Sequence, residues 1–221
     1  MRSAAELYDW ELAHVSGRGH QDLEFYAALA SRTGGPVLEL ACGTGRLTVP
    51  LDAVGLDVDP AMLALARRRG ARRLVCADMR RFALARLFGL VAIPYNSIQL
   101  LVGAADLVAC LRCAAGHLLA GGVLALEVTD FQLGAVRREV EPQLLAAAAG
   151  VTLHGSLRHD LERRTTTYRR RFEEGGCLRV DEVRLRCLDR DELGGLVEQA
   201  GLRLVDVVDD PPRLLAVAAP R

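Results

Sequence analysis

Short apolar segments alternate with segments of helical spacing between residue 37 and about residue 128. The apolar segments are VLEL, AVGLDV, RLVCAD, FGLVAIPY and GGVLALEV, and AMLALARRRG and DLVACLRCAAGHLL between them have helical spacing. Strands that are apolar on both faces and separated by helices are typical of a parallel sheet that is covered on both sides. The pattern therefore predicts a doubly wound α/β domain.

The pattern is different on either side of this region. Residues 3 to 32 have the spacing of two helices with a break at SGRGHQ, and such a segment can pack across the carboxyl ends of the strands, where ligands bind. After residue 130, VTLHGSLRHDLERRTTTYRRRFEE and LRVDEVRLRCL alternate apolar and charged residues, which indicates antiparallel strands with one solvated face. We interpret their arginine cluster as part of that solvated face. The segment DRDELGGLVEQAG predicts a helix, RLVDVVDD and LLAVAAP predict strands, and LLAAAAG suggests a helix end.

Composition narrows the classes of function. The 221 residues are 51% hydrophobic, enough for one substantial core, and 28 basic residues balance 28 acidic ones. This balance does not favour nucleic acid or an anionic membrane as a partner, so a small molecule is the simpler expectation. None of the basic residues is a lysine, which excludes a P-loop lysine, a pyridoxal-phosphate Schiff base and a lysine base.

Cysteine usage and the apolar segments indicate a cytoplasmic protein. The six cysteines lie in apolar segments, as reduced and buried thiols do. Cys110 and Cys113 form a CxxC without a second pair of ligands, so we attribute them to helix packing and predict no metal. The first residues do not have the pattern of a secretory signal, and no apolar run reaches the ~18 residues of a membrane span.

The turn ACGTGR follows the first predicted strand and carries Gly43 and Gly45. A glycine turn after a parallel strand lets the backbone approach an anionic or zwitterionic ligand closely. Asp57 ends the second predicted strand, where a carboxylate can accept hydrogen bonds from a ribose diol. A dinucleotide fold asks for a third small residue, but Thr48 stands there, so the turn alone leaves the cofactor open.

Five ordered segments extend this pattern, namely VLELACGTGR, GLDVDPAML, CADMRRF, FGLVAIPYNSIQLL and LAGGVLALEV. Together they resemble the successive motifs of the class I S-adenosylmethionine-dependent methyltransferases, most closely small-molecule enzymes such as sugar N-methyltransferases and glycine methyltransferase-like enzymes. The resemblance implies a Rossmann-like, mostly parallel seven-stranded sheet with an antiparallel β insertion before the last helix. It also implies a helical lid (1–35), a cofactor-binding core (36–130), an insertion covering the substrate (131–188) and a segment completing the core sheet (189–221).

The resemblance implies roles for the first half of the cofactor site. Gly43 and Gly45 would face the methionine part of S-adenosylmethionine, which becomes S-adenosylhomocysteine after transfer. Glu39 would hold the glycine turn or the cofactor's amino group. Asp57 would bind the ribose hydroxyls, and Met62 would pack on the adenine. For two of these residues a structural role is the alternative: Glu39 could only cap the glycine turn, and Met62 could be an ordinary core residue.

The second half of the site is implied in the same way. Asp78 would accept a hydrogen bond from the adenine amine, and the backbone N–H of Met79 would serve the ring. The Ile93–Pro94 turn would offer a carbonyl to the cofactor's ammonium group. An N-terminal tyrosine and a basic residue close over the site in relatives, which suggests Tyr8 and Arg18 here.

Methyl transfer from a sulfonium is a direct displacement, so alignment matters more than a dedicated base, which is needed only for a protonated or weakly acidic acceptor. No universal catalytic residue is therefore expected. The side chains that we expect near the acceptor, each with a structural role as its alternative, are Tyr8, Tyr95, Asn96, Gln99, His154 and Tyr168.

The acceptor is expected to be the amine or hydroxyl of a small molecule, and a homodimer is left open. Rival hypotheses are an NAD(P)-dependent oxidoreductase and a non-catalytic cofactor-binding module. The sequence departs from the methyltransferase pattern at Gly89, where relatives often carry Asp.

The connection from Gly45 to Val54 is unusually short. A strand–helix–strand crossover needs at least about 10 to 12 residues, but only Arg46 to Ala53 lie between them. We expect either a severely shortened helix with a stretched connection or a sequence that lacks a short segment near Leu51 and Asp52.

Overall fold

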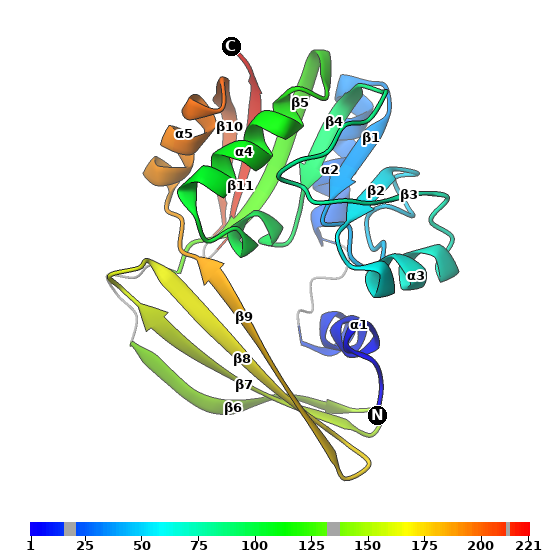
Figure 1. Ribbon diagram of the computed structural model, residues 1–221, viewed down its shortest axis with the longest axis vertical. Helices are drawn as coiled ribbons and strands as arrows, with labels where there is room; N and C mark the ends of the chain where they lie inside the picture. Colours follow the sequence, from blue (N-terminus) through cyan, green and yellow to red (C-terminus); the bar gives the residue numbers. More distant parts are fainter. Residues whose placement is uncertain (16–20, 132–137, 211–212) are drawn as a thin grey trace.

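The computed structural model describes residues 1–15, 21–131, 138–210 and 213–221. A seven-stranded sheet lies above a separate four-stranded sheet, and the N-terminal helix lies beside the smaller sheet (Figure 1). The helices are α1 (Ala4–His14), α2 (Gln21–Thr33), α3 (Pro60–Arg68), α4 (Ala104–Ala115) and α5 (Arg190–Gln199), with a 3₁₀ turn η1 (Ser97–Leu100).

The seven-stranded sheet has the order β10-β11-β5-β4-β1-β2-β3, and β11 is antiparallel to both of its neighbours. The other neighbouring strands pair in parallel. The doubly wound, mostly parallel seven-stranded sheet that the sequence predicts is thereby confirmed. Its strands are β1 (Val37–Leu40), β2 (Val54–Asp57), β3 (Arg73–Cys76), β4 (Phe88–Ile93), β5 (Leu118–Thr129), β10 (Leu202–Asp210) and β11 (Arg213–Pro220).

The antiparallel insertion is a four-stranded sheet in the order β6-β7-β8-β9. Its strands are β6 (Glu139–Ala148), β7 (Val151–Asp160), β8 (Thr165–Glu174) and β9 (Cys177–Arg186). The alternation of apolar and charged residues predicted β7, β8 and β9 correctly. It did not predict β6, and the interpretation of LLAAAAG as a helix end was wrong. Ala146 to Ala148 pair with β7, because cross-strand pairing in the folded protein outweighs the helix propensity of alanine.

Two apolar cores cover the faces of the large sheet. α4 and α5 pack on one face around buried residues such as Leu111 and Val197, and α2 packs on the other through Tyr26 and Leu29. The CxxC of the sequence lies in α4, where Cys110 is fully buried. Among the described residues, no helix is long and apolar enough to cross a membrane.

The short crossover between β1 and β2 consists of turns and forms no regular helix. Val49 donates to the carbonyl of Gly45 and Leu51 to that of Leu47, which makes a single helix-like turn before the chain re-enters the sheet. Gly45 has φ +83°, and a Cβ at this position would meet the Cβ of Ala66 at 3.0 Å. The crossover is thus closed by turns within Arg46 to Ala53, and the choice between a shortened helix and a missing segment stays a prediction.

Candidate functional site

Two cavities meet at the carboxyl ends of the parallel strands. The larger has a volume of about 500 Å³ and the smaller about 20 Å³, and Ala41 in the turn after β1 lines both. Because one residue forms a wall of each, the cavities are neighbouring parts of a single elongated site. We call them the large cavity and the small cavity.

The large cavity is more apolar than polar and has carboxylates at the ends of two strands. Asp57 ends β2, and Asp78 follows β3. The side chain of Asp78 pairs with Arg80 at 2.6 Å, and the hydrogen bonds from Arg80 lower the pKa of Asp78 to about 2. The cavity is lined by Ala41, Leu56, Asp57, Val58, Ala77, Asp78, Met79, Arg80, Leu100, Leu101, Val102, Gly103 and Asp106.

Asp57 holds the glycine turn in place. The backbone N–H of Gly43 donates to Oδ2 of Asp57 at 2.7 Å, and that of Asp59 donates to Oδ1 at 2.9 Å. Each carboxylate oxygen has two acceptor positions, so Asp57 keeps one on each oxygen for a ligand in the large cavity. The residue therefore both shapes the turn and faces the ligand space.

The small cavity lies beside a buried carboxyl group. Glu39 in β1 is 3% exposed and accepts a hydrogen bond from the hydroxyl of Thr48. Burial raises the pKa of Glu39 to about 8, so the carboxyl is protonated at neutral pH until a cation binds nearby. Tyr8, Pro94 and Tyr95 also line this cavity.

Arg46 is the cationic residue of the small cavity, and the sequence analysis missed it. Asp22 at the start of α2 holds its guanidinium with two hydrogen bonds of 2.6 and 2.5 Å. The guanidinium lies 5.9 Å from the centre of the Tyr95 ring. Its place directly after the glycine turn was the available signal. A guanidinium fixed in this way can still donate to a carboxylate of a ligand.

The small insertion sheet and α1 are joined by a buried carboxylate. Glu11 is 7% exposed and accepts hydrogen bonds from the hydroxyl of Tyr168 at 2.9 Å and from Arg170 at 2.9 Å. Burial raises the pKa of Tyr168, and the nearby charge of Glu11 adds to the effect. Arg170 therefore does not belong to the solvated face, contrary to our interpretation of the arginine cluster, whereas its neighbours Arg169 and Arg171 are exposed.

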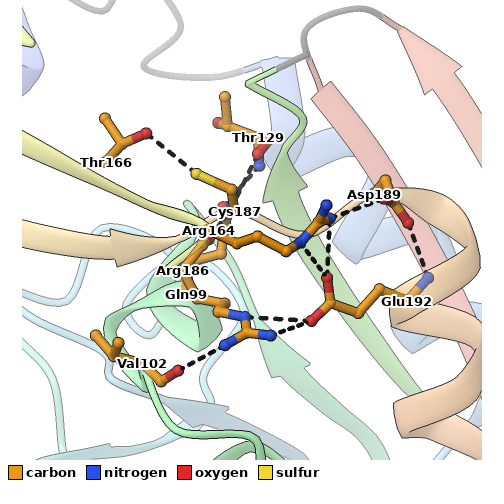
Figure 2. Close-up of polar contacts among 9 residues, drawn as sticks. All are labelled: Gln99, Val102, Thr129, Arg164, Thr166, Arg186, Cys187, Asp189 and Glu192. Atoms are coloured by element: carbon orange, nitrogen blue, oxygen red, sulfur yellow. Dashed lines mark hydrogen bonds and ion pairs between the residues drawn. The ribbon is translucent and has the colours of Figure 1, made fainter. Parts of the chain in front are cut away.

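A network of polar contacts fixes the insertion to the large sheet (Figure 2). The buried side chain of Gln99 donates to the carbonyls of Thr129 and Arg186 and accepts from the N–H of Thr129. Arg186 pairs with Glu192 of α5 at 2.6 Å and donates to the carbonyl of Val102, which lines the large cavity. Gln99 thus has a structural role, and the network connects the insertion to the wall of the large cavity.

The structure separates the predicted site residues into groups. Asp57, Asp78 and Met79 line the large cavity, and Tyr8, Glu39, Pro94 and Tyr95 line the small one. Gly43 shapes the turn, Gly45 packs on α3, and Arg18 lies outside the described residues. Residues that line neither cavity are Met62, Ile93, Asn96, His154 and Tyr168.

Several of those remaining residues have other contacts. Ile93 is fully buried in the core, and Asn96 accepts a hydrogen bond from the hydroxyl of Thr129 at 2.8 Å. His154 lies across from Arg171 in the register, so its side chain is on the sheet face opposite Leu153, which packs in the cluster with Trp10 of α1. Met62 is only partly buried on α3. The cofactor and catalytic roles suggested for these residues stay predictions.

Comparison with known proteins supports a single family. Residues 37–122 match a family model described as a methyltransferase domain. A dTDP-3-amino-3,6-dideoxy-α-D-glucopyranose N,N-dimethyltransferase of Streptomyces fradiae is 39% identical over 135 residues, which cover 56% of this chain and 52% of the relative. The chain spans about half the length or less of the two curated relatives it matches.

Solved structures match over the whole chain. DesVI of Streptomyces venezuelae has a TM-score of 0.84 and 25% identity, with 100% of both chains covered. CalS10 of Micromonospora echinaspora, an amino pentose methyltransferase solved with bound S-adenosylmethionine, has a TM-score of 0.80 and 26% identity, with 100% of this chain and 98% of that chain covered.

Proposed function

We propose that this chain, whose fold and matched domain are those of the class I S-adenosylmethionine-dependent methyltransferases, moves a methyl group from S-adenosylmethionine to an amine of a small molecule. The observation that carries the proposal is the elongated site, because it places acidic side chains at the ends of β1 and β2 beside one glycine turn. S-adenosylmethionine has matching groups along its length, namely an adenine, a ribose diol, a sulfonium and an amino acid end.

The polar and apolar groups that line the site fit the successive parts of this cofactor. Asp57 has free acceptor positions for the ribose hydroxyls, and the apolar large cavity with Asp78 and the Met79 backbone suits the adenine. Glu39 beside the small cavity suits an ammonium group, and Arg46 suits a carboxylate. When bound, S-adenosylmethionine supplies a methyl group on a positively charged sulfur that is already a good leaving group.

The residues of this chain then have to position the acceptor and exclude water. Burial raises the pKa of Tyr8, and it also raises that of Tyr168, so both phenols are neutral hydrogen-bond donors rather than bases. Tyr8 lines the small cavity, where it can orient the acceptor. We infer that the amine reacts as its free base, and that alignment supplies most of the acceleration.

An amine is favoured over a hydroxyl by the relatives. Both curated relatives are named as N,N-dimethyltransferases of dTDP-linked amino sugars, and CalS10 is named as an amino pentose methyltransferase. All of these are methyl transfer enzymes, so the oxidoreductase alternative is not favoured. We therefore propose an amino sugar as the acceptor.

Titration calorimetry with S-adenosylmethionine and with NADH tests the cofactor assignment. We expect binding of S-adenosylmethionine and a weakening of about tenfold or more in Asp57→Asn, because the Gly43 contact and the ribose contact share this carboxylate. Asp52→Asn is the matched control, since Asp52 is exposed in the same crossover and pairs with Arg72. Binding of NADH without S-adenosylmethionine would overturn the proposal, and mass spectrometry of amino sugars incubated with the cofactor tests the acceptor.

A further inference from the structure

One wall of the large cavity belongs to no helix or strand. Ala77, Asp78, Met79 and Arg80 form this wall, and they begin the segment that connects β3 to β4. We call this segment, residues 77–87, the 77–87 loop. The adenine contacts proposed above depend on where the backbone of this loop lies, so residues that hold the loop act on the cofactor from outside the site.

One face of α4 carries polar side chains along the 77–87 loop. Asp106, Cys110 and Cys113 are separated by four and three residues, the spacing that places side chains in one line along a helix. Asp106 lies in the first turn of α4 and Cys113 in the last, about 11 Å further along at 1.5 Å per residue. His117 follows four residues later, just beyond the end of the helix. The line is therefore long enough to hold the loop at several points.

The first two contacts of this line are with Arg80 and Phe82 of the loop. Arg80 pairs with Asp106 at 3.1 Å. The thiol of Cys113 donates to the carbonyl of Phe82 at 3.2 Å and accepts from the N–H of the same residue at 3.4 Å. Cys113 thus engages both backbone groups of one loop residue, which a side chain that only filled space would not do.

His117 makes the third contact and is fixed on both ring nitrogens. Its Nδ1 lies 2.7 Å from the carbonyl oxygen of Cys113, which can only accept, so Nδ1 carries the proton. Nε2 then has the lone pair that accepts from the N–H of Leu84 at 3.1 Å. The ring also stacks on Phe82, with 4.4 Å between the ring centres. His117 therefore holds the loop by its backbone and in a single tautomer.

These hydrogen bonds do what apolar packing of the loop cannot. Met79, Phe82 and Leu84 are partly buried and pack against the same core as α4. Such packing is non-directional, whereas a hydrogen bond to the backbone specifies distance and angle. A displacement of about 1 Å in the backbone at Met79 is enough to misplace a donor for a bound ring.

We propose that Cys113 and His117 are positioning residues that set the preference of the large cavity for adenine over other purines. The carboxylate of Asp78 and the backbone N–H of Met79 suit the amine of adenine and the ring nitrogen beside it. Hypoxanthine has an oxygen in place of that amine and a proton on that nitrogen, so both contacts become repulsive. This preference requires the loop to stay in place, and the inference rests on the proposed binding of S-adenosylmethionine.

Calorimetric titration with S-adenosylhomocysteine and with S-inosylhomocysteine, which carries hypoxanthine instead of adenine, tests the inference. The unaltered protein should bind the adenine compound at least about tenfold more tightly. His117→Ala should lower this preference about fivefold, the size of one or two hydrogen bonds. His117→Gln keeps an acceptor of similar reach and should restore most of the preference.

Cys113 provides a second pair of variants. Cys113→Ala should lower the preference about threefold, because a thiol forms weaker hydrogen bonds, and Cys113→Ser should retain most of it, since a hydroxyl also donates and accepts. Cys110→Ala is the matched control, because Cys110 lies on the same face of α4 but is fully buried in the core. It should lower the melting temperature and leave the preference unchanged.

The ratio of the two affinities separates positioning from general stability. The same ratio in His117→Ala, Cys113→Ala and the unaltered protein, or an equal fall in Cys110→Ala, would overturn the inference while the proposed function stands. Failure of the unaltered protein to bind either compound would overturn the proposed function and the inference with it.

Discussion

Replacement of Glu39 by glutamine should change how the stability of the protein depends on pH. The carboxyl is buried in β1 and has a pKa of about 8, compared with an ordinary value of 4.5. Between these two values the folded protein binds a proton that the unfolded chain releases, so this group makes the protein less stable as pH rises through that window. Glutamine has a similar shape, can accept the hydrogen bond from Thr48 and cannot ionise.

The size of the effect follows from the two pKa values. A shift of one pKa unit corresponds to about 1.4 kcal/mol, so the full window corresponds to roughly 5 kcal/mol. Between about pH 6 and pH 8 the free energy of unfolding should fall by about 2 kcal/mol in the unaltered protein through this group alone. Glu39→Gln should lack that decrease.

Urea denaturation of both proteins at about pH 6, 7 and 8 measures the difference, and comparison of their pH slopes cancels the contributions of all other groups. Parallel slopes would show that Glu39 ionises normally and would refute the reasoning. Cofactor affinity provides a second measurement. Glu39→Gln should bind S-adenosylmethionine about tenfold less tightly, since it has lost the charge proposed to face the ammonium group.

Three further predictions follow from the described contacts. Gly89→Ala should lower the melting temperature by several degrees, because a Cβ there would overlap the carbonyl oxygen of Gly34, and a melting temperature equal to that of the unaltered protein would contradict this packing. Glu11→Gln should raise the KM for the acceptor more than the Kd for the cofactor, because the hydrogen bond from the Tyr168 hydroxyl to this side chain weakens. An equal change in KM and Kd would argue against a role of Tyr168 at the acceptor. Arg46→Met should weaken S-adenosylmethionine binding at least tenfold while S-adenosylmethionine lacking its carboxylate binds as before, and calorimetry with both ligands distinguishes the outcomes.

Elements with a strong local pattern could be predicted from the sequence. The buried strands VLEL and FGLVAI and the Asp189 cap of the last helix follow directly from hydrophobic runs and capping chemistry, and the structure has β1, β4 and α5 there. The segment LLAAAAG was misjudged, because alanine is a good helix former in isolation and its pairing partner lies elsewhere in the chain. Local pattern does not include such long-range pairing.

The site was predictable to a similar extent. Asp57 and Asp78 were recognisable as acids at the ends of apolar strands, and the structure places both beside the large cavity. Arg46 was not recognised, because its role depends on Asp22 from a helix 24 positions away. The glycine at position 89, a departure from the methyltransferase pattern, has a packing reason that only the neighbouring backbone of Gly34 reveals.

No regular helix follows the glycine turn, so the shape of the turn depends on contacts with distant parts of the fold. Its backbone is held by hydrogen bonds from Cys42 to Leu56 and from Gly43 to Asp57, and its Thr44 hydroxyl bonds to Asp9 of α1. A graft of the turn into another sheet would leave those partners behind and lose its shape. Natural variation in this turn should therefore be accompanied by variation in α1 and at the end of β2, so that these three segments are inherited together.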